Sequence, residues 1–115
     1  MSENVLQTLR KTSIIRGKEW RKKAPKKASK KALRDFAAIE LFGEVGELCN
    51  AIKKILRHDM GWAGGVKDMT NLREEIGDVA ISLDLLAQKY DIDLWEAIVE
   101  KFNKTSKKHK FKTRL

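Results

Sequence analysis

Two pairs of carboxylates, each with its members three residues apart, are the groups in this sequence best suited to chemistry. The pairs are Glu44 with Glu47 and Glu75 with Asp78. Residues three apart on a helix lie on the same face, so each pair places two like charges side by side. Carboxylate oxygens are the ligands that magnesium and manganese prefer. A divalent cation held between two such helices would relieve the repulsion, and the spacing therefore predicts a metal site.

The alternative for either pair alone is an ordinary acidic helix edge, because acidic pairs are common on helices. Two pairs that each border an apolar stripe favour the metal site, since burial beside such a stripe makes ionisation costly. Other chemistries fit less well. His58 and His109 are far apart and lack the spacing of a zinc site. Cys49 has no evident base partner and is interpreted as a small packed residue, and the sequence contains no GxxxxGK[ST] phosphate loop.

The elements that must position these groups follow from the apolar periodicity. Apolar residues recur with a helical period in four segments, which are residues 4–23, 30–58, 71–90 and a segment that begins near Asp93. The only proline, Pro25, is expected to end the first helix, and the glycine-rich residues 59–70 are typical of a loop. No segment has the alternation of a strand, so the predicted class is all-α with a four-helix-bundle-like architecture.

The second helix is predicted to carry a core-facing stripe beside its acidic row. At 100° per residue the stripe falls within a sector about 100° wide. Its members are Ala37, Leu41, Val45, Leu48, Ile52, Ile55 and Leu56. Glu40, Glu44 and Glu47 form the neighbouring row, with Gly43 and Gly46 interleaved. Each helical glycine costs about 1 kcal/mol relative to alanine, and the close approach of another backbone or of a ligand would explain both.

Charge is distributed unevenly along the 115 residues. The net charge is +9, but residues 1–34 carry 12 Lys/Arg against 2 Asp/Glu, residues 35–100 carry 6 against 14, and residues 101–115 carry 7 against none. An acidic centre between basic ends suits a cation site that handles a polyanion, whereas a nucleic-acid binder of this size more often spreads its basic residues over its body. The plainer alternative is a solvated basic tail at each end.

Length and composition bound the remaining possibilities. A chain of this size is enough for one domain, but a deep cleft would strain so small a monomer, so a core or cleft shared between subunits is plausible. One cysteine excludes an intramolecular disulfide. No apolar run is long enough to cross a bilayer, and residues 1–20 lack the apolar core of a signal peptide. These features predict a cytoplasmic protein without membrane association.

Three parts of the sequence together resemble the signatures of a known family. They are EVGELCNAIKK at 44–54, EEIGDV at 74–79 followed by LDLLA at 83–87, and DIDL at 91–94 followed by EKFNKTS at 100–106. An ExxE pair, a variable loop and an ExxD pair in this order resemble the MazG-like all-α nucleotide pyrophosphohydrolases. The resemblance covers roughly residues 36–106. It divides the chain into a basic N-terminal part (1–34), a catalytic helical core (35–106) and a basic tail (107–115).

The resemblance implies an activity and a set of site residues. Members of the family cleave nucleoside triphosphates between the α and β phosphates, which releases a nucleoside monophosphate and pyrophosphate. The positions that match the magnesium ligands are Glu44, Glu47, Glu75 and Asp78, with Mn²⁺ as a possible substitute. The positions that match the phosphate- or sugar-holding segment are Lys101, Asn103 and Lys104, and Lys54 is a further candidate. Members assemble as homodimers or homotetramers.

One departure from the family pattern affects the catalytic assignment. Many members carry an extra Glu just before the first metal ligand, and this chain has Gly43 there. Glu40 is our first candidate to orient the attacking water, and Glu74 is the second. Trp20 or Trp62 is a candidate to stack on the base, although filling an interface is the favoured interpretation for either tryptophan. Two other functions stay open, namely a helical nucleic-acid-binding module that uses the basic ends and a catalytically silent relative.

Overall fold

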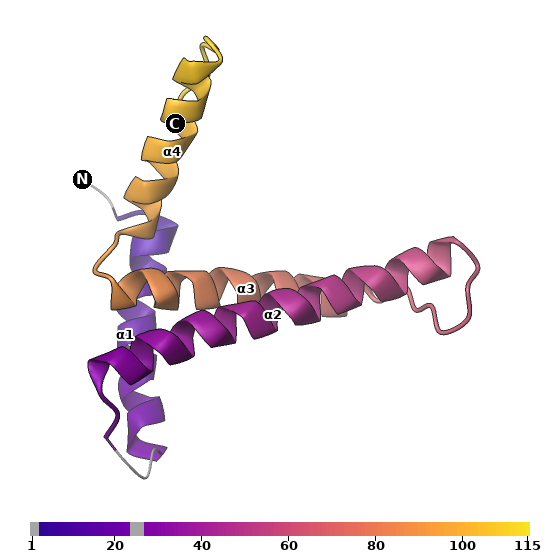
Figure 1. Cartoon of the computed structure of the whole chain (residues 1–115), viewed down its shortest axis with the longest axis horizontal. Coiled ribbons are helices and arrows are strands. Elements are labelled where there is room, and N and C mark those ends of the chain that lie inside the picture. The colour runs from indigo at the N-terminus through magenta and orange to yellow at the C-terminus, as the bar shows by residue number, and fades with distance from the viewer. Residues whose placement is uncertain (1–2, 24–26) are drawn as a thin grey trace. The chain divides into compact units, whose positions relative to one another are not determined.

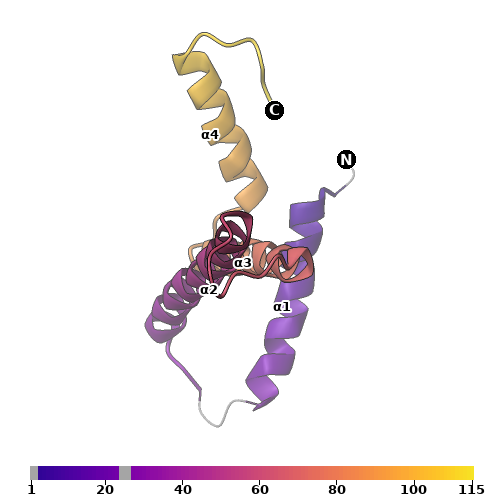
Figure 2. The same ribbon diagram turned by 90° about the vertical axis from the view of Figure 1, so that its right-hand side faces the viewer.

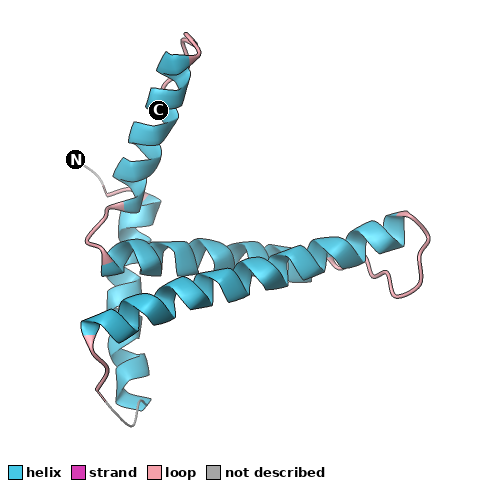
Figure 3. Cartoon of the chain, in the orientation of Figure 1, coloured by secondary structure: helices cyan, strands magenta, loops and turns pink. Residues whose placement is uncertain are grey.

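Helices dominate the chain, as the periodicity predicts. The computed structural model describes residues 3–23 and 27–115, and within these ranges it contains helices and loops without a strand (Figure 3). The helices are α1 (Val5–Lys23), α2 (Lys30–Asp59), α3 (Met69–Lys89) and α4 (Leu94–Lys108). The predicted all-α class is therefore confirmed. Pro25, which was expected to end the first helix, lies outside the described residues.

The chain divides into two compact units. Residues 28–86 form one unit, in which α2 and α3 lie side by side as a helical hairpin (Figure 1). The rest of the chain forms the other, in which the Arg10 guanidinium of α1 donates a hydrogen bond to the main-chain oxygen of Ile92, just before α4 (2.6 Å). None of the helices in the described ranges is long and apolar enough to span a membrane. The predicted division at residues 34 and 106 stays a prediction.

Side chains cap the start of each of the four helices in the described ranges. The caps are Asn4, Ser29, Asp68 and Asp93, which accept hydrogen bonds of 2.9–3.1 Å from main-chain N–H groups three residues later. Such caps satisfy N–H groups that have no partner within the helix. The cap predicted at Asp93 is therefore confirmed, with Glu96 N–H as its donor.

The glycine-rich loop closes the hairpin by backbone conformations that favour glycine. Gly61 has φ +70° and Gly64 has φ +79°, both in the left-handed region that other residues rarely adopt. Gly65 lies so close to α2 that an added Cβ would collide with the main chain of Arg57 and His58. The Val66 N–H then donates to the Lys54 main-chain oxygen (3.1 Å), which holds the loop against the end of α2. The loop prediction is confirmed at residues 60–68.

The burial predicted along α2 is correct for only part of the stripe. Ala37 is buried and Leu41 and Leu48 are half-buried, but Val45, Ile52 and Leu56 are 38%, 49% and 55% exposed. Cys49 is also exposed, contrary to its interpretation as a packed residue. The physical reason is that α2 has two apolar faces, of which one is covered. The other face, which we call the α2 seam, comprises the half-buried Ala38 and the exposed residues Phe42, Val45, Cys49, Ile52 and Leu56.

Candidate metal centre

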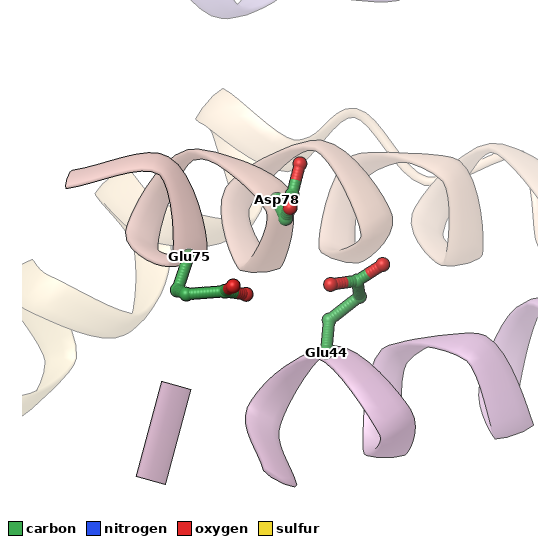
Figure 4. A group of neighbouring side chains, drawn as sticks. All are labelled: Glu44, Glu75 and Asp78. Atoms are coloured by element: carbon green, nitrogen blue, oxygen red, sulfur yellow. The ribbon is translucent and has the colours of Figure 1, made fainter. Parts of the chain in front are cut away.

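The helical hairpin brings three of the predicted metal ligands together. Glu44 lies in the middle of α2, and Glu75 and Asp78 lie one turn apart on α3. One carboxylate oxygen from each residue lies within 4.8 Å of the other two. Figure 4 shows Glu44 pointing from α2 toward α3 and Glu75 pointing from α3 toward α2. Residues 31 positions apart in the sequence thus form one cluster of oxygen donors.

The charges of the cluster act on one another. Burial raises the pKa of Glu44 above its usual value, and the neighbouring charges of Asp78, Glu47 and Glu75 raise it further. Burial likewise raises the pKa of Glu75, followed by the charges of Glu47 and Asp78. A pKa shift of this direction means that the charged form is held at a cost, because the site lacks compensating positive charge.

Two oxygens of the cluster lack a partner. Glu44 Oε2 and Glu75 Oε2 are buried, and neither has a hydrogen-bond partner among the described residues. Buried polar atoms without partners are rare in folded proteins and costly. A hard divalent cation would satisfy both oxygens and offset the repulsion, and carboxylate oxygens are the donors that Mg²⁺ and Mn²⁺ take. The donor set therefore fits such an ion.

Glu47, the fourth predicted ligand, lies at the edge of this cluster. Its side chain is exposed on α2, one turn beyond Glu44. The Glu47 charge is the largest charge effect on the pKa of Glu75, after burial, and a side-chain hydrogen bond between Glu75 and Glu47 raises this pKa further. The structure therefore brings Glu47 near Glu75, although the tight group of three oxygens does not include it. The metal-ligand role of all four residues stays a prediction.

The two candidates for orienting water occupy different positions relative to the cluster. Glu40 is exposed on α2 one turn before Glu44, and its charge contributes to the raised pKa of Glu44. Glu74 is exposed on α3 and contributes to the raised pKa of Glu75. Adjacent helical residues point about 100° apart, so Glu74 is directed away from the face that carries Glu75. Glu40 therefore remains the first candidate for orienting the attacking water, and Glu74 remains the second.

The predicted substrate-binding residues lie on three helices. Lys54 is exposed on α2, ten residues and so about 15 Å along the axis from Glu44. Trp20 is 65% exposed on α1, with Lys23 Nζ 5.8 Å from its ring centroid. On α4 are Lys101 and Lys104, both exposed, and the half-buried Asn103. Trp62, the other tryptophan candidate, is 61% exposed in the loop. Their roles stay predictions.

Two features of the structure have no counterpart in the sequence analysis. Asp84 is only 1% exposed and is the most buried large side chain described. No structural or functional role was predicted for it from the sequence. The signal was present, because Asp84 is a charged residue inside the apolar run 83–86. The second feature concerns Asn103, whose side-chain amide is already bound by the main chain of Leu115. No local pattern indicates a contact twelve residues away.

The helical glycines of α2 leave open space. A Cβ added at Gly43 or at Gly46 would meet no atom within 4 Å. The close approach of a backbone, expected as one explanation for these glycines, is therefore not provided by the described part of this chain. The approach of a ligand, or of the backbone of another chain, is not addressed by this finding.

Comparisons with known proteins agree with the carboxylate pattern. The family model of the MazG nucleotide pyrophosphohydrolase domain matches residues 37–112, which include the whole acidic row of α2, the loop and all of α3 and α4. No curated protein and no solved structure matches the chain.

Proposed function

This chain belongs to the MazG nucleotide pyrophosphohydrolase family, and we propose that it hydrolyses a nucleoside or deoxynucleoside triphosphate to the monophosphate and pyrophosphate with Mg²⁺. One observation carries the proposal. Within a cluster of three carboxylates from two helices, Glu44 and Glu75 each keep a buried oxygen that has no hydrogen-bond partner in the described part of the chain. A surface that served stability alone would not retain them, because each leaves a buried polar group unsatisfied.

The carboxylates are assigned as the metal ligands. Glu44, Glu75 and Asp78 supply the converging oxygens, and Glu47 completes the set from the neighbouring turn of α2. A divalent cation bound there neutralises phosphate oxygens and lowers the pKa of a water molecule. The hairpin holds the carboxylates in place before substrate arrives, and such pre-positioning is the main contribution that a protein makes to phosphoryl chemistry.

Glu40 is assigned to orient the attacking water and accept its proton. Its position one turn before Glu44 places it on the same helical face as the ligands, and its charge reaches Glu44. Glu74 remains the second candidate. Because the proton transfer needs a carboxylate, Glu40→Gln is expected to lower kcat by about 10²-fold or more, whereas Glu74→Gln is expected to leave it within a few-fold. The reverse result would transfer the role to Glu74.

Basic and aromatic residues are assigned to the substrate. Lys54, Lys101 and Lys104 would balance the charge of the triphosphate and of the leaving pyrophosphate. Asn103 would hydrogen-bond to a phosphate or to the sugar, and Trp20 would stack on the base. These assignments rest on the family pattern and on the exposure of the side chains.

We also propose that the protein acts as a homo-oligomer, either a dimer or a tetramer. The α2 seam supports this, because its residues follow one another at alternating spacings of four and three, the repeat of helices that pack lengthwise. Phe42 is the most exposed large apolar residue of the seam, at 78%. Phe42→Asp should shift the species toward monomer in sedimentation. Phe36→Asp is the matched control, since Phe36 is 64% exposed but lies off the seam.

The test of the enzymatic function is a product analysis. Purified protein with Mg²⁺ is incubated with a panel of standard and modified nucleoside triphosphates, and the products are separated by chromatography. We expect a monophosphate and pyrophosphate in equal amounts from at least one member of the panel. Release of orthophosphate with a diphosphate would refute the assignment of the α–β bond.

Carboxylate variants connect the activity to the proposed centre. Glu47→Gln and Asp78→Asn should abolish turnover, while Asp35→Asn should not, since Asp35 is an exposed carboxylate on α2 that pairs with Lys31 (2.8 Å). Two competing functions have distinct signatures. A silent relative would bind nucleotide without turnover, and a nucleic-acid-binding module would bind DNA or RNA with steep salt dependence.

A further inference from the structure

The segment after α4 folds back along its own helix. The helix ends at Lys108, and Lys110 takes the left-handed conformation with φ +58°. The Phe111 N–H donates to the Ser106 main-chain oxygen (2.8 Å) and the Lys110 N–H to that of Lys107 (3.1 Å). This pair of hydrogen bonds is a Schellman motif, which reverses the chain at a helix end. Residues 110–115, which we call the strap, therefore run back beside α4 (Figure 2).

The strap ends on a two-point contact with Asn103. The Asn103 amide donates from Nδ2 to the Leu115 main-chain oxygen (3.2 Å), and its Oδ1 accepts from the Leu115 N–H (2.8 Å). The amide group thus uses both its donor side and its acceptor side on one strap residue. A ligand that makes the same two-point contact with Asn103 must first break these bonds.

Further contacts within the strap keep it folded against α4. Phe111 forms one wall of an apolar groove of about 610 Å³, with Ile98 and Phe102 of α4 on the other. The Arg114 guanidinium donates to the main-chain oxygens of Phe111 (2.6 Å) and Thr113 (2.9 Å), which stiffens the turn. The Schellman turn thus directs the basic end onto α4 of the same chain.

We propose that the strap competes with the nucleotide for Asn103, so that it occupies this residue in the free protein and leaves it when substrate binds. The inference rests on the proposed function, in which Asn103 contacts the nucleotide. The competition predicts a change in the apparent affinity for the substrate. A protein whose binding residue is free only part of the time has a weaker apparent affinity in proportion to that fraction.

A matched pair of substitutions tests the competition without altering Asn103. Leu115→Pro removes the N–H that donates to Asn103, whereas Leu115→Ala keeps it. With one of the two strap bonds lost, Leu115→Pro should lower KM for the substrate about three- to tenfold at unchanged kcat. Leu115→Ala should behave like the unchanged protein. Equal KM values for the two variants would overturn the proposal.

A second measurement follows the strap directly. In the free protein, NMR should show slow solvent exchange of the Leu115 N–H. Addition of Mg²⁺ with an equimolar mixture of the α,β-methylene analogues of the four dNTPs, which resist cleavage, should speed this exchange and shift the Asn103 side-chain resonances. Magnesium tripolyphosphate has no base or sugar, so release by this probe as well would assign the competing contact to the phosphates. Unchanged or slower exchange of the Leu115 N–H with both probes would overturn the proposed competition between the strap and the nucleotide.

The two proposals fail in different ways. If the protein hydrolyses nucleotides while the Leu115 N–H stays protected at saturation, the proposed function stands and the strap is refuted. If no nucleotide is hydrolysed but the analogues release Leu115, the strap stands as a binding device and the enzymatic function is refuted.

Discussion

The two units of this chain use carboxylates in opposite ways. In the α2–α3 hairpin, Glu75 sits among other acidic groups, and burial and their charges raise its pKa. In the unit that contains α4, Asp93 accepts a hydrogen bond from the Glu96 N–H, which lowers its pKa. The same chemical group thus destabilises one unit and stabilises the other. A carboxylate whose pKa is raised by its surroundings costs folding stability. We therefore interpret the acidic cluster as a ligand site and not as a stabilising feature.

Overall charge follows the same division. Residues 28–86 hold 8 Lys/Arg and 10 Asp/Glu, whereas the rest of the chain holds 17 and 6. The acidic centre predicted from the sequence is therefore largely the hairpin itself. Substitutions and solution conditions that act on one of the two units test this contrast.

Substitution at the two kinds of carboxylate should separate activity from stability. Glu44→Gln should reduce turnover by about 10³-fold, because it removes a ligand of the catalytic ion, yet raise the melting temperature of the metal-free protein by removing a repelled charge. Asp93→Ala should leave kcat within a few-fold but lower the melting temperature by about 4–8 °C through loss of the helix cap. Kinetics and thermal unfolding in EDTA measure both. If Glu44→Gln destabilised the metal-free protein, the carboxylate would be structural.

Metal binding should stabilise the hairpin. At a Mg²⁺ concentration of about 100 times its dissociation constant, linkage predicts a stabilisation of about 2.7 kcal/mol. EDTA should reverse the shift in melting temperature. Glu75→Gln should abolish it, and Asp35→Asn, outside the cluster, should retain it. A shift that survived in Glu75→Gln would place the ion elsewhere.

The fold could be read from the sequence where the signals are local. The periodicity of residues 30–58 and the cap at Asp93 act within a few residues, and both predictions agree with α2 and α4. The carboxylate spacing is local as well, and because a short loop joins the two helices, Glu44 and Glu75 come together once the hairpin forms. The spacing alone does not fix which ion binds or how many ions the site holds.

Other features depend on neighbours that a single helix does not reveal. Leu41 is half-buried and Ile52 is 49% exposed, although both lie in the stripe predicted for α2. Which apolar side chain is buried depends on the side from which α3 approaches. The hydrogen bonds between Asn103 and Leu115 likewise require the chain reversal at Lys110. Lys110 has the left-handed conformation, which a sequence usually signals by a glycine.

Alanine substitutions at two glycines of the hairpin should change stability in opposite directions. Gly65→Ala should destabilise the protein by about 1–3 kcal/mol, because its Cβ would meet the main chain of α2. Gly46→Ala should stabilise it by up to about 1 kcal/mol, since space is open there and alanine favours the helix. Chemical denaturation measures both. If Gly46→Ala raises stability but also raises KM, a ligand occupies the open space beside α2.

Acidification should act on the two units with opposite signs. The folded-state pKa values of Glu44 and Glu75 lie above those of the unfolded chain, so their contribution to stability grows as pH falls from neutral toward about 4.3 and is lost as pH rises. The folded-state pKa of Asp93 is lowered, so its contribution is present at neutral pH and disappears as pH falls below about 4.

Thermal unfolding of the metal-free protein between pH 7 and pH 3 measures this difference. We expect a maximum of stability in mild acid, and Glu44→Gln should flatten the rise toward that maximum. Saturating Mg²⁺ should remove the rise, because the ion takes the place of the protons. A stability that fell steadily from neutral pH in the metal-free protein would contradict the pKa directions of the hairpin.

Helix ends provide the smallest expected difference between the units. After α2 the left-handed position is Gly61, but after α4 it is Lys110. A side chain in this conformation costs about 1–2 kcal/mol, and glycine loses about 0.5–1 kcal/mol more entropy on folding, so Lys110→Gly should stabilise the protein by about 0.5–1 kcal/mol. Gly61→Lys should have the opposite sign by the same reasoning. Chemical denaturation resolves both changes. If Lys110→Gly were destabilising, the Lys110 side chain would itself hold the strap, and the reversal after α4 would depend on more than backbone hydrogen bonds.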